Sequence, residues 1–583
     1  MGRRRTILAL TASAVACLAL ICGAAACSPA SGPSTAGALS SSPSATAAAG
    51  APAGRATVTI VGTNDLHGRV HALPLLSGYV SRLRELRKDD GGVVLVDGGD
   101  MFQGTLESNL AEGLPVVAAY AAMGYDAVTV GNHEFDFGPA GPAATPRDPS
   151  DDPRGALKAA AAAAPFPFLA ANVLDAATKQ PVDWPNIEPS AMVTVGGAKV
   201  GLIGVTTIET LTTTISANVK GLEIAPLGDT IAKQAASLRR AGAAAVVVLA
   251  HAGGKCKAFT GNASTDGCDE RAEIFRLARE LPRGTIDVIV AGHTHAGVAH
   301  EVEGVAIIEQ HSYGRAFGRV DLVIEAGAVV DRRIHPPRDL CPGIDKPDFD
   351  LCDPGEYEGV KIARDARVAA AVAPAIDGAR AKRAELVGTD LPEGLRRAYD
   401  DESPLGNLFA DLLRESRPNV DVGLMNGGGL RADLPRGALK YGSLFEAFPF
   451  DNQVAITEMD GRSFRQVVRG HLERGGGILS FSGVLVKAAC KKGVLWVDLE
   501  KNGKPVKDDD LLVVAGSDFL FTGGDNFWGD VKPPHVAVLD ELMRDALERG
   551  FKKRASIAPT TVFDPKKPRL SLSARRPIKC TTN

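Results

Sequence analysis

The sequence lacks several features that would place it in large functional classes. Its 583 residues carry a net charge of only -4, so nothing indicates the basic surface of a nucleic-acid-binding protein. Beyond the first 26 residues, no apolar run is long enough to span a bilayer. The cysteines show no C-x-x-C spacing, which argues against a zinc knuckle, and there is no internal repeat of fixed period. What remains is a chain of ordinary globular composition, long enough for two or more domains.

The N-terminus has the features of an export signal. A basic start, MGRRR, precedes the apolar stretch TILALTASAVACLALICGAAA, and Cys27 then stands where a bacterial lipobox has its cysteine. We expect a signal peptide over residues 1–26 and lipid attachment at Cys27; the alternative is cleavage after Ala26 with Cys27 unmodified. Residues 27–54, rich in Ser, Ala, Pro and Gly, are expected to carry the anchor and to form a flexible tether. The protein is therefore expected to be exported, either anchored on the outer face of the cell membrane or secreted.

The cysteine count agrees with export. Three of the nine cysteines lie in or beside the signal, and an even number remains, which suggests disulfides in an exported chain. These six are Cys256, Cys268, Cys341, Cys352, Cys490 and Cys580. Spacing favours joining the first to the second and the third to the fourth, and the last two then pair by elimination. The sequence alone leaves other pairings open.

The chain from residue 57 onward alternates between buried strands and helices. Runs such as GGVVLVDGGD, KVGLIGVT and DVIVAGHTH are rich in Val, Ile and Leu, which indicates strands covered on both faces and hence an α/β fold. We expect a first domain over residues 55–358, a helical linker over 359–384 and a second domain over 385–583.

Polar clusters follow five of the predicted strands, where α/β proteins place their ligands. They are NDLHG with Asp65 and His67, DGGD with Asp97 and Asp100, GNHEFD with Asn132, His133 and Asp136, AHAGG with His251, and AGHTH with His293 and His295. One histidine after a strand is most often a capping or packing residue, but five such clusters in one domain indicate a shared site. Carboxylate, amide and imidazole ligands suit two divalent ions such as zinc or manganese. Histidines outside these clusters, His300 among them, are expected to be structural or on the surface.

The order D-x-H, G-G-D, G-N-H-E, H and G-H-x-H resembles that of the calcineurin-like metallophosphoesterases. The later motifs ESPLGNLFAD, NGGGLRADLP and FTGGDNF resemble the secreted bacterial 5'-nucleotidase family, which includes UDP-sugar hydrolases and 2',3'-cyclic phosphodiesterases. The resemblance extends over about residues 57 to 560. It implies a four-layer αββα metallophosphoesterase domain followed by a C-terminal α/β 5'-nucleotidase domain that binds the substrate.

The resemblance also implies roles for individual residues. One metal ion would be held by Asp65, His67, Asp100 and His295, and the other by Asp100, Asn132, His251 and His293, with Asp100 bridging the two. Zinc, manganese or cobalt would fit these ligands, although the family also has Gln at the position of His295. His133 would lie over the phosphate and Asp136 would orient its ring. Glu134 is expected to be a structural acceptor and Asp97 a turn residue.

The C-terminal motifs imply the specificity residues. Arg431 would bind phosphate, Asn426 the nucleobase, Phe450 and Phe519 the two faces of the base, and Asp525 a ribose hydroxyl. Either Phe could instead be a core residue. The sequence departs from the family at Tyr399, Asp400 and Asp401, where a further Arg is usual, which puts the handling of a second phosphate in doubt.

These observations predict an exported, lipid-anchored two-metal phosphohydrolase that releases phosphate from extracellular nucleotides. Its partners would be a nucleotide and, through the anchor, a membrane, but no nucleic-acid polymer. A 2',3'-cyclic-nucleotide phosphodiesterase or a UDP-sugar hydrolase of the same fold is the alternative. From another class, the chain could be a surface binding protein that has lost catalysis, although such decayed sites usually lose ligands.

Overall fold

A computed structural model describes residues 54–141, 143–261, 263–341 and 352–581. The predicted signal peptide, the Cys27 lipidation site and the tether up to residue 53 lie outside the described residues. Among the residues that are described, no helix is both long enough and apolar enough to cross a membrane.

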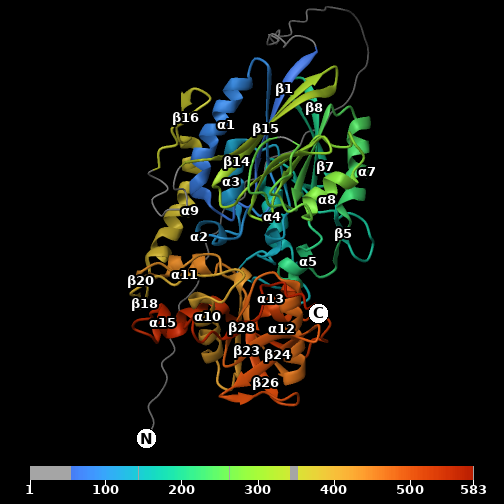
Figure 1. The fold of residues 1–583 in the computed structure, drawn as a ribbon. Coiled ribbons are helices and arrows are strands. Elements are labelled where there is room, and N and C mark those ends of the chain that lie inside the picture. Colours follow the sequence, from blue (N-terminus) through green and yellow to red (C-terminus); the bar gives the residue numbers. More distant parts are fainter. Residues whose placement is uncertain (1–53, 142, 262, 342–351, 582–583) are drawn as a thin grey trace, which may run out of the picture. The chain divides into compact units, whose positions relative to one another are not determined.

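Two large sheets form the first half of the fold (Figure 1). The first sheet has the order β15 (Ala328–Asp339), β14 (Ala316–Glu325), β1 (Arg55–Thr63), β2 (Gly91–Asp97), β3 (Ala127–Thr129), β4 (Phe168–Leu169) and β6 (Ile187–Glu188). The second sheet has the order β12 (Gly297–Val302), β13 (Val305–Gln310), β11 (Val288–Ala291), β10 (Ala245–His251), β8 (Ala198–Thr206) and β7 (Ser190–Val195). The central strands of both sheets run parallel, so their carboxyl ends open at one edge.

The two sheets pack face to face through a layer of buried aliphatic side chains. Ile60 and Val94 from the first sheet and Leu202, Val247 and Ile308 from the second are all buried in it. Burying such side chains fully contributes about 1.5–3 kcal/mol each. This layer explains why the strands read as continuous apolar runs, since both faces of each sheet are covered.

Helices cover the outer faces of both sheets. The first sheet packs against α1 (Leu73–Arg87), α3 (Leu114–Met123) and α4 (Gly155–Ala163), and the second against α7 (Leu227–Arg240) and α8 (Glu273–Glu280). Helix α7 shows how the sequence sets this layer: Leu227, Ile231, Ala235 and Leu238 recur at helical spacing and are the buried residues. The predicted αββα layering is therefore confirmed.

The second half of the fold begins after α9 (Ala366–Ala384), which fills most of the predicted linker. A five-stranded sheet has the order β22 (Leu479–Ser482), β19 (Val422–Asn426), β26 (Leu511–Ser517), β21 (Gln453–Asp460) and β27 (Val536–Leu542). The helices around it are α10 (Pro404–Glu415), α11 (Tyr441–Ala447), α12 (Gly461–Arg474) and α14 (Met543–Lys552). A second small sheet contains β25 (Lys504–Pro505), β24 (Val494–Lys501), β23 (Leu485–Lys491) and β28 (Leu570–Leu572). This is the mixed α/β arrangement predicted for the C-terminal part.

Shorter elements connect these layers. They are β5 (Val173–Asp175), β9 (Leu222–Ile224), β16 (Glu356–Tyr357), β17 (Val360–Lys361), β18 (Leu386–Leu391), β20 (Gly437–Lys440), α2 (Leu106–Asn109), α5 (Thr210–Thr213), α6 (Ser216–Val219), α13 (Asp518–Phe521) and α15 (Pro559–Val562).

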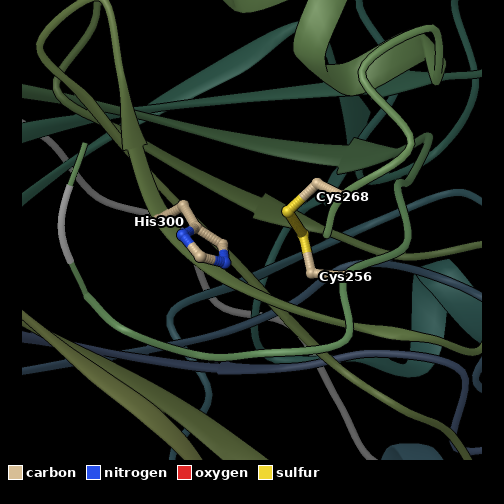
Figure 2. A group of neighbouring side chains, drawn as sticks. All are labelled: Cys256, Cys268 and His300. Carbon is tan, nitrogen blue, oxygen red and sulfur yellow. A yellow bond between two sulfur atoms is a disulfide. The ribbon is translucent and has the colours of Figure 1, made fainter. Parts of the chain in front are cut away.

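Three disulfides join the six cysteines in the predicted pairs: Cys256–Cys268, Cys341–Cys352 and Cys490–Cys580. Figure 2 shows the His300 ring beside the first of them. His300 Nε2 lies 2.8 Å from Ala258 O, so the ring is tied to the backbone. Because the two sulfurs are bonded to each other, neither is a thiolate, and in this oxidised form the group is not a metal site.

Candidate active site

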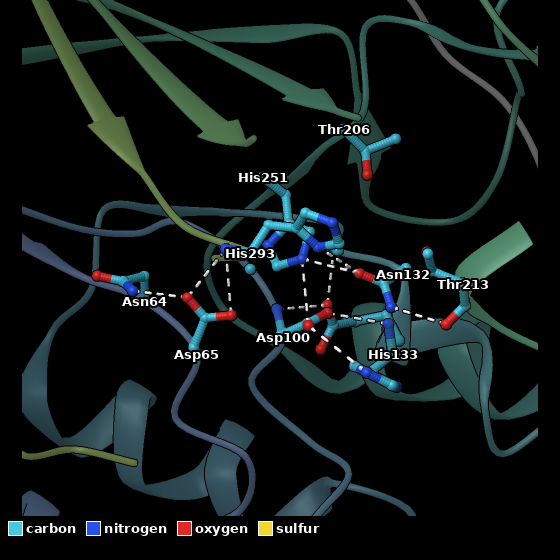
Figure 3. Close-up of polar contacts among 12 residues, drawn as sticks. Asn64, Asp65, Asp100, Asn132, His133, Thr206, Thr213, His251 and His293 are labelled. Atoms are coloured by element: carbon cyan, nitrogen blue, oxygen red, sulfur yellow. Dashed lines mark hydrogen bonds and ion pairs between the residues drawn. The ribbon is translucent and has the colours of Figure 1, made fainter. Parts of the chain in front are cut away.

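The predicted strand-end residues converge at the carboxyl edge of the two sheets (Figure 3). Asp65 and His67 follow β1, Asp100 follows β2, Asn132 follows β3, His251 ends β10, and His293 and His295 follow β11. Five of these seven residues have positive φ, with values of 49° at Asp65, 48° at His67, 58° at Asp100, 79° at His293 and 57° at His295. Non-glycine residues rarely adopt this conformation, and where the surrounding structure enforces it, functional sites are over-represented.

The first group of side chains comprises Asp65, His67 and His295, whose potential ligand atoms all lie within 4.8 Å of one another. His67 Nε2 is 3.0 Å from His295 Nε2, and His295 Nε2 is 3.4 Å from Asp65 Oδ1. Burial would raise the pKa of Asp65, but His295 opposes it and holds that pKa at about 2. The group can therefore offer one carboxylate and two imidazoles to a cation.

The second group comprises Asp100, His251 and His293, whose ligand atoms also lie within 4.8 Å of one another. Asn132 joins them: its Oδ1 is 3.0 Å from His251 Nε2 and 3.1 Å from His293 Nδ1. The Asn132 amide is oriented by donation from Nδ2 to Thr213 O at 3.1 Å, which leaves Oδ1 pointing into the group.

Asp100 lies between the two groups. Its Oδ2 is 3.1 Å from His251 Nε2 and 3.9 Å from His67 Nε2. The side chain is buried, which would raise its pKa, but His251 and His133 together hold the pKa well below its usual range. Asp100 in turn raises the pKa of His251 to about 10, against the effect of burial. One carboxylate thus has a position from which it can serve both groups.

The donor set fits two divalent cations. His67 and His251 each place Nδ1 at 2.8 Å from a backbone carbonyl, that of Gln103 and that of Gly98 respectively. A carbonyl can only accept, so Nδ1 carries a proton, and Nε2 is the atom that can lose its proton and bind a cation. Such fixing of the outer nitrogen is characteristic of metal-binding histidines.

His133 lies beside this set without belonging to either group. Its Nδ1 is 2.6 Å from Asp136 Oδ2, and its Nε2 is 4.0 Å from Asp100 Oδ2. Burial lowers the pKa of His133, but Asp136 and Asp100 outweigh this and raise it. The predicted carboxylate–histidine pair is therefore present, with Nε2 directed toward the donor set.

Glu134 is the predicted structural acceptor, and Asp97 is the predicted turn residue. Glu134 is buried and accepts N–H bonds from Asp100 (2.8 Å), Met101 (2.7 Å) and Gly131 (2.7 Å), so it ties the loop after β2 to the loop after β3. Burial raises the pKa of Glu134 to about 8. Asp97 accepts from the Gly99 N–H at 2.8 Å within the turn.

Two of the predicted substrate-binding residues of the C-terminal part lie at the donor set. Arg431 Nη2 is 3.5 Å from His67 Nε2, and the guanidinium lies 5.5 Å from the Phe450 ring centroid. The Phe450 ring is in turn 5.7 Å from the His133 ring.

The other three form a separate group. Asn426 Nδ2 donates to Asp525 Oδ2 at 2.9 Å. Phe519 is half-buried and packs on Gly524, where an added Cβ would come within 2.5 Å of its ring. No contact between Phe450 and Phe519 occurs among the described contacts, so the base sandwich stays a prediction.

Several residues that sequence reasoning missed support the site. Thr214 Oγ1 donates to Asp136 Oδ1 at 2.7 Å, and Asn64 Nδ2 donates to Asp65 Oδ2 at 2.6 Å. Glu209 Oε2 lies 3.6 Å from His293 Nε2. Asn64 belongs to the NDLHG motif and could have been singled out. Thr214 and Glu209 stand in a stretch with no recognisable motif.

Family comparisons agree with this geometry. Residues 58–297 match the family model described as calcineurin-like phosphoesterase, and residues 383–530 match that of the 5'-nucleotidase C-terminal domain. The first domain defines the class as that of the metallophosphoesterases. With both domains present, the chain belongs to the two-domain 5'-nucleotidase family of calcineurin-like phosphoesterases.

Individual relatives are similar at moderate identity. Protein UshA of Salmonella pullorum is 26% identical over 529 residues, covering 82% of this chain and 88% of its own. Endonuclease YhcR of Bacillus subtilis is 28% identical over 445 residues, which cover 72% of this chain but only 33% of YhcR. The 5'-nucleotidase of Diplobatis ommata is 23% identical, covering 81% of this chain and 83% of its own. The 5'-nucleotidase precursor of Thermus thermophilus shares the fold, with a TM-score of 0.68 at 21% identity over 88% of this chain and 99% of its own.

Proposed function

We propose that the protein is an exported two-metal phosphohydrolase that releases phosphate from nucleotides, as a 5'-nucleotidase does. The observation that carries the proposal is that three sets of side chains lie next to one another. The seven-residue donor set lies beside the His133–Asp136 pair, and Arg431 and Phe450 approach it from the C-terminal part. A cation-binding centre, a proton-carrying imidazole, a phosphate-binding guanidinium and an aromatic face together suit a phosphorylated aromatic molecule.

The two groups of side chains would hold one cation each. Asp65, His67 and His295 would bind the first and Asn132, His251 and His293 the second, with Asp100 shared between them. When bound, two such ions of the zinc, manganese or cobalt kind supply Lewis acidity and lower the pKa of water.

His133 would act on the reacting phosphate. Its Nδ1 is held by Asp136, so Nε2 is the atom free to donate to a phosphate oxygen or to give a proton to the oxygen that leaves. Hydrolysis breaks the bond between phosphorus and the nucleoside oxygen, and that oxygen must gain a proton. The raised pKa of His133 favours the protonated ring that this role needs.

The C-terminal residues would provide specificity. Arg431 offers a planar pair of N–H donors that matches phosphate. Phe450 and Phe519 would stack on the nucleobase, and Asn426 and Asp525 would bind the base and a ribose hydroxyl. The half-exposed surface of both Phe rings is compatible with this.

Export and lipid anchoring at Cys27 are part of the proposal. They are supported by the N-terminal sequence and by three disulfides, which persist in oxidising compartments. A relative named cell wall protein Lmo0130, from Listeria monocytogenes, is 26% identical over 497 residues, covering 77% of this chain and 58% of its own.

A substrate panel tests the proposal. Phosphate release should be measured from AMP, ADP, ATP and p-nitrophenyl phosphate. Chromatography should follow the opening of 2',3'-cyclic AMP to an adenosine monophosphate and the cleavage of UDP-glucose to UMP and glucose 1-phosphate. Nuclease activity should be measured on DNA and RNA because one relative is named an endonuclease. The proposal expects the highest kcat/KM on a nucleoside monophosphate. Turnover of the cyclic nucleotide or of UDP-glucose alone would favour the corresponding alternative, and no turnover of any substrate would favour a binding protein.

Phe450→Ala is expected to weaken nucleotide use selectively. Stacking contributes roughly 1–3 kcal/mol per base, so KM for AMP should rise by roughly 5- to 150-fold. p-Nitrophenyl phosphate has no base, so its kinetics should change far less. Trp496→Ala removes an exposed ring on β24, in another sheet. This control should leave kcat and KM unchanged with both substrates. Equal losses with AMP and p-nitrophenyl phosphate would show that Phe450 does not bind the base.

A further inference from the structure

Glu309 is a fully buried carboxylate that no motif explains. It lies in β13, the apolar strand Val305–Gln310, in which every residue is buried, and its own exposure is 0%. Placing a carboxylate in such a strand costs free energy unless hydrogen bonds compensate. Its location therefore requires a reason beyond packing.

The hydrogen bonds of Glu309 go to two different loops. Oε2 accepts from the Gly254 N–H at 2.9 Å, in the loop after β10. Oε1 accepts from the Thr294 hydroxyl at 2.5 Å, in the loop after β11. The same Thr294 hydroxyl lies 2.6 Å from Gly254 O, so the carboxylate and the hydroxyl close a compact link between the loops.

The second loop carries His293 and His295, and the first loop starts directly after His251, the last residue of β10. His251 stands three residues before Gly254, while His293 and His295 flank Thr294. The carboxylate of Glu309 is in close contact with the first loop. A Cβ added at Gly253 would lie only 2.7 Å from its Oε2 and 2.8 Å from its Oε1. There is no space at Gly253 for a side chain between the first loop and Glu309.

Glu134 links two other loops of the site in the same way, those after β2 and β3. Its carboxylate joins the loop of Asp100 to that of Asn132 through three backbone N–H bonds. Two buried glutamates thus join four of the five strand-end loops in two pairs. Unlike Glu134, Glu309 belongs to none of the motifs that indicated the site.

We propose that Glu309 is a positioning residue of the metal centre, which fixes His251, His293 and His295 by clamping their two loops together. This inference rests on the proposed metal-binding role of these histidines. It does not depend on which substrate the protein uses.

A matched control lies at the opposite ends of β10 and β11. Asp287, also buried, accepts from the Val246 N–H at 2.8 Å and from Arg239 at 2.6 Å, and so ties the start of β11 to the start of β10. It is a buried carboxylate between the same strands, at the ends away from the histidine loops. If Glu309 only stabilised the sheet, Asp287→Asn and Glu309→Gln would have the same kinds of effect.

The test is the metal affinity of the purified full chain, stripped with a chelator and titrated calorimetrically with Zn²⁺ or Mn²⁺. In Glu309→Gln the amide NH2 faces either the Gly254 N–H, which is a donor, or the Thr294 hydroxyl, which must then turn its proton to Gly254 O. The link is changed in both cases, so we expect affinity to fall by roughly 10- to 100-fold, as for other outer partners of metal ligands. The visible spectrum of the Co²⁺-loaded protein should change as well. Asp287→Asn should lower Tm and leave metal affinity and spectrum unchanged.

Thr294→Val provides a second variant if Glu309→Gln does not fold. This substitution removes only the hydroxyl that joins Glu309 to the loop after β11, and it should also weaken metal binding. Wild-type affinity and spectrum in a folded Glu309→Gln or Thr294→Val protein would overturn the proposal. A wild-type chain that binds two ions but does not hydrolyse AMP would contradict the proposed substrate and leave the role of Glu309 standing. A wild-type chain that binds no metal would overturn both.

Discussion

Asp100→Asn is expected to abolish phosphate release and to strip the protein of bound metal. Asp100 Oδ1 accepts the His133 N–H at 2.9 Å, so an asparagine would keep its oxygen there and place its NH2 where Oδ2 now lies. That NH2 would face His251 and His67 with no lone pair and no charge for a cation. Activity should fall by at least roughly 10²–10³-fold, the usual loss for one missing electrostatic contact at a reacting centre.

Metal content by plasma mass spectrometry and phosphate release from AMP check this prediction together. Asp126→Asn is the matched control, because Asp126 also accepts a backbone N–H, that of Leu95 at 2.8 Å, but lies just before the start of β3, away from the site. The control should retain both metal and activity. An Asp100→Asn protein with two bound ions and full turnover would show that Asp100 does not bridge the centre.

His133→Ala is expected to leave metal content near wild type while kcat for AMP falls by roughly 10²–10⁴-fold, the usual contribution of a positioned acid or base. His133 contributes no atom to either ligand group, yet its ring contacts both His67 and Phe450. Loss of the ring should therefore lower kcat and leave the number of bound metal ions unchanged. A large loss of bound metal would instead make His133 a ligand.

The role of Asp136 follows from the same experiment. Within the described residues, Asp136 reaches the donor set through His133 Nδ1, so Asp136→Asn should slow the wild-type enzyme but should have no further effect in the His133→Ala background. If the two losses multiplied in the double variant, Asp136 would act independently of the imidazole.

The sequence could predict much of this centre because parallel strands expose their carboxyl ends at one edge. Asp65, Asp100, Asn132, His251 and His293 are far apart in the chain, but each stands just after an apolar run, and that position alone predicts that they meet. The two short-range disulfides were predictable for a similar reason, since cysteines eleven or twelve residues apart have few other partners within reach.

Other features could not be read from the sequence. Glu309 sits inside an apolar strand, and only the packing of β13 behind two loops reveals its contacts. The left-handed backbone at Asp65, His67 and Asp100 is enforced by tertiary contacts, since nothing in their residue types requires it. Whether Phe519 faces Phe450 across a bound base depends on the substrate as well as the chain, so that pairing remains a prediction.

The central claim is that metal ions at the two side-chain groups enable hydrolysis of a nucleotide phosphate. The most direct measurement is to strip the protein of metal, add back Mn²⁺ or Zn²⁺ in steps, and follow phosphate release from AMP against bound metal per chain. The account predicts no turnover without metal and a rate that reaches its plateau as the second ion binds. Full turnover in the metal-free protein, or none after two ions are bound, would contradict it.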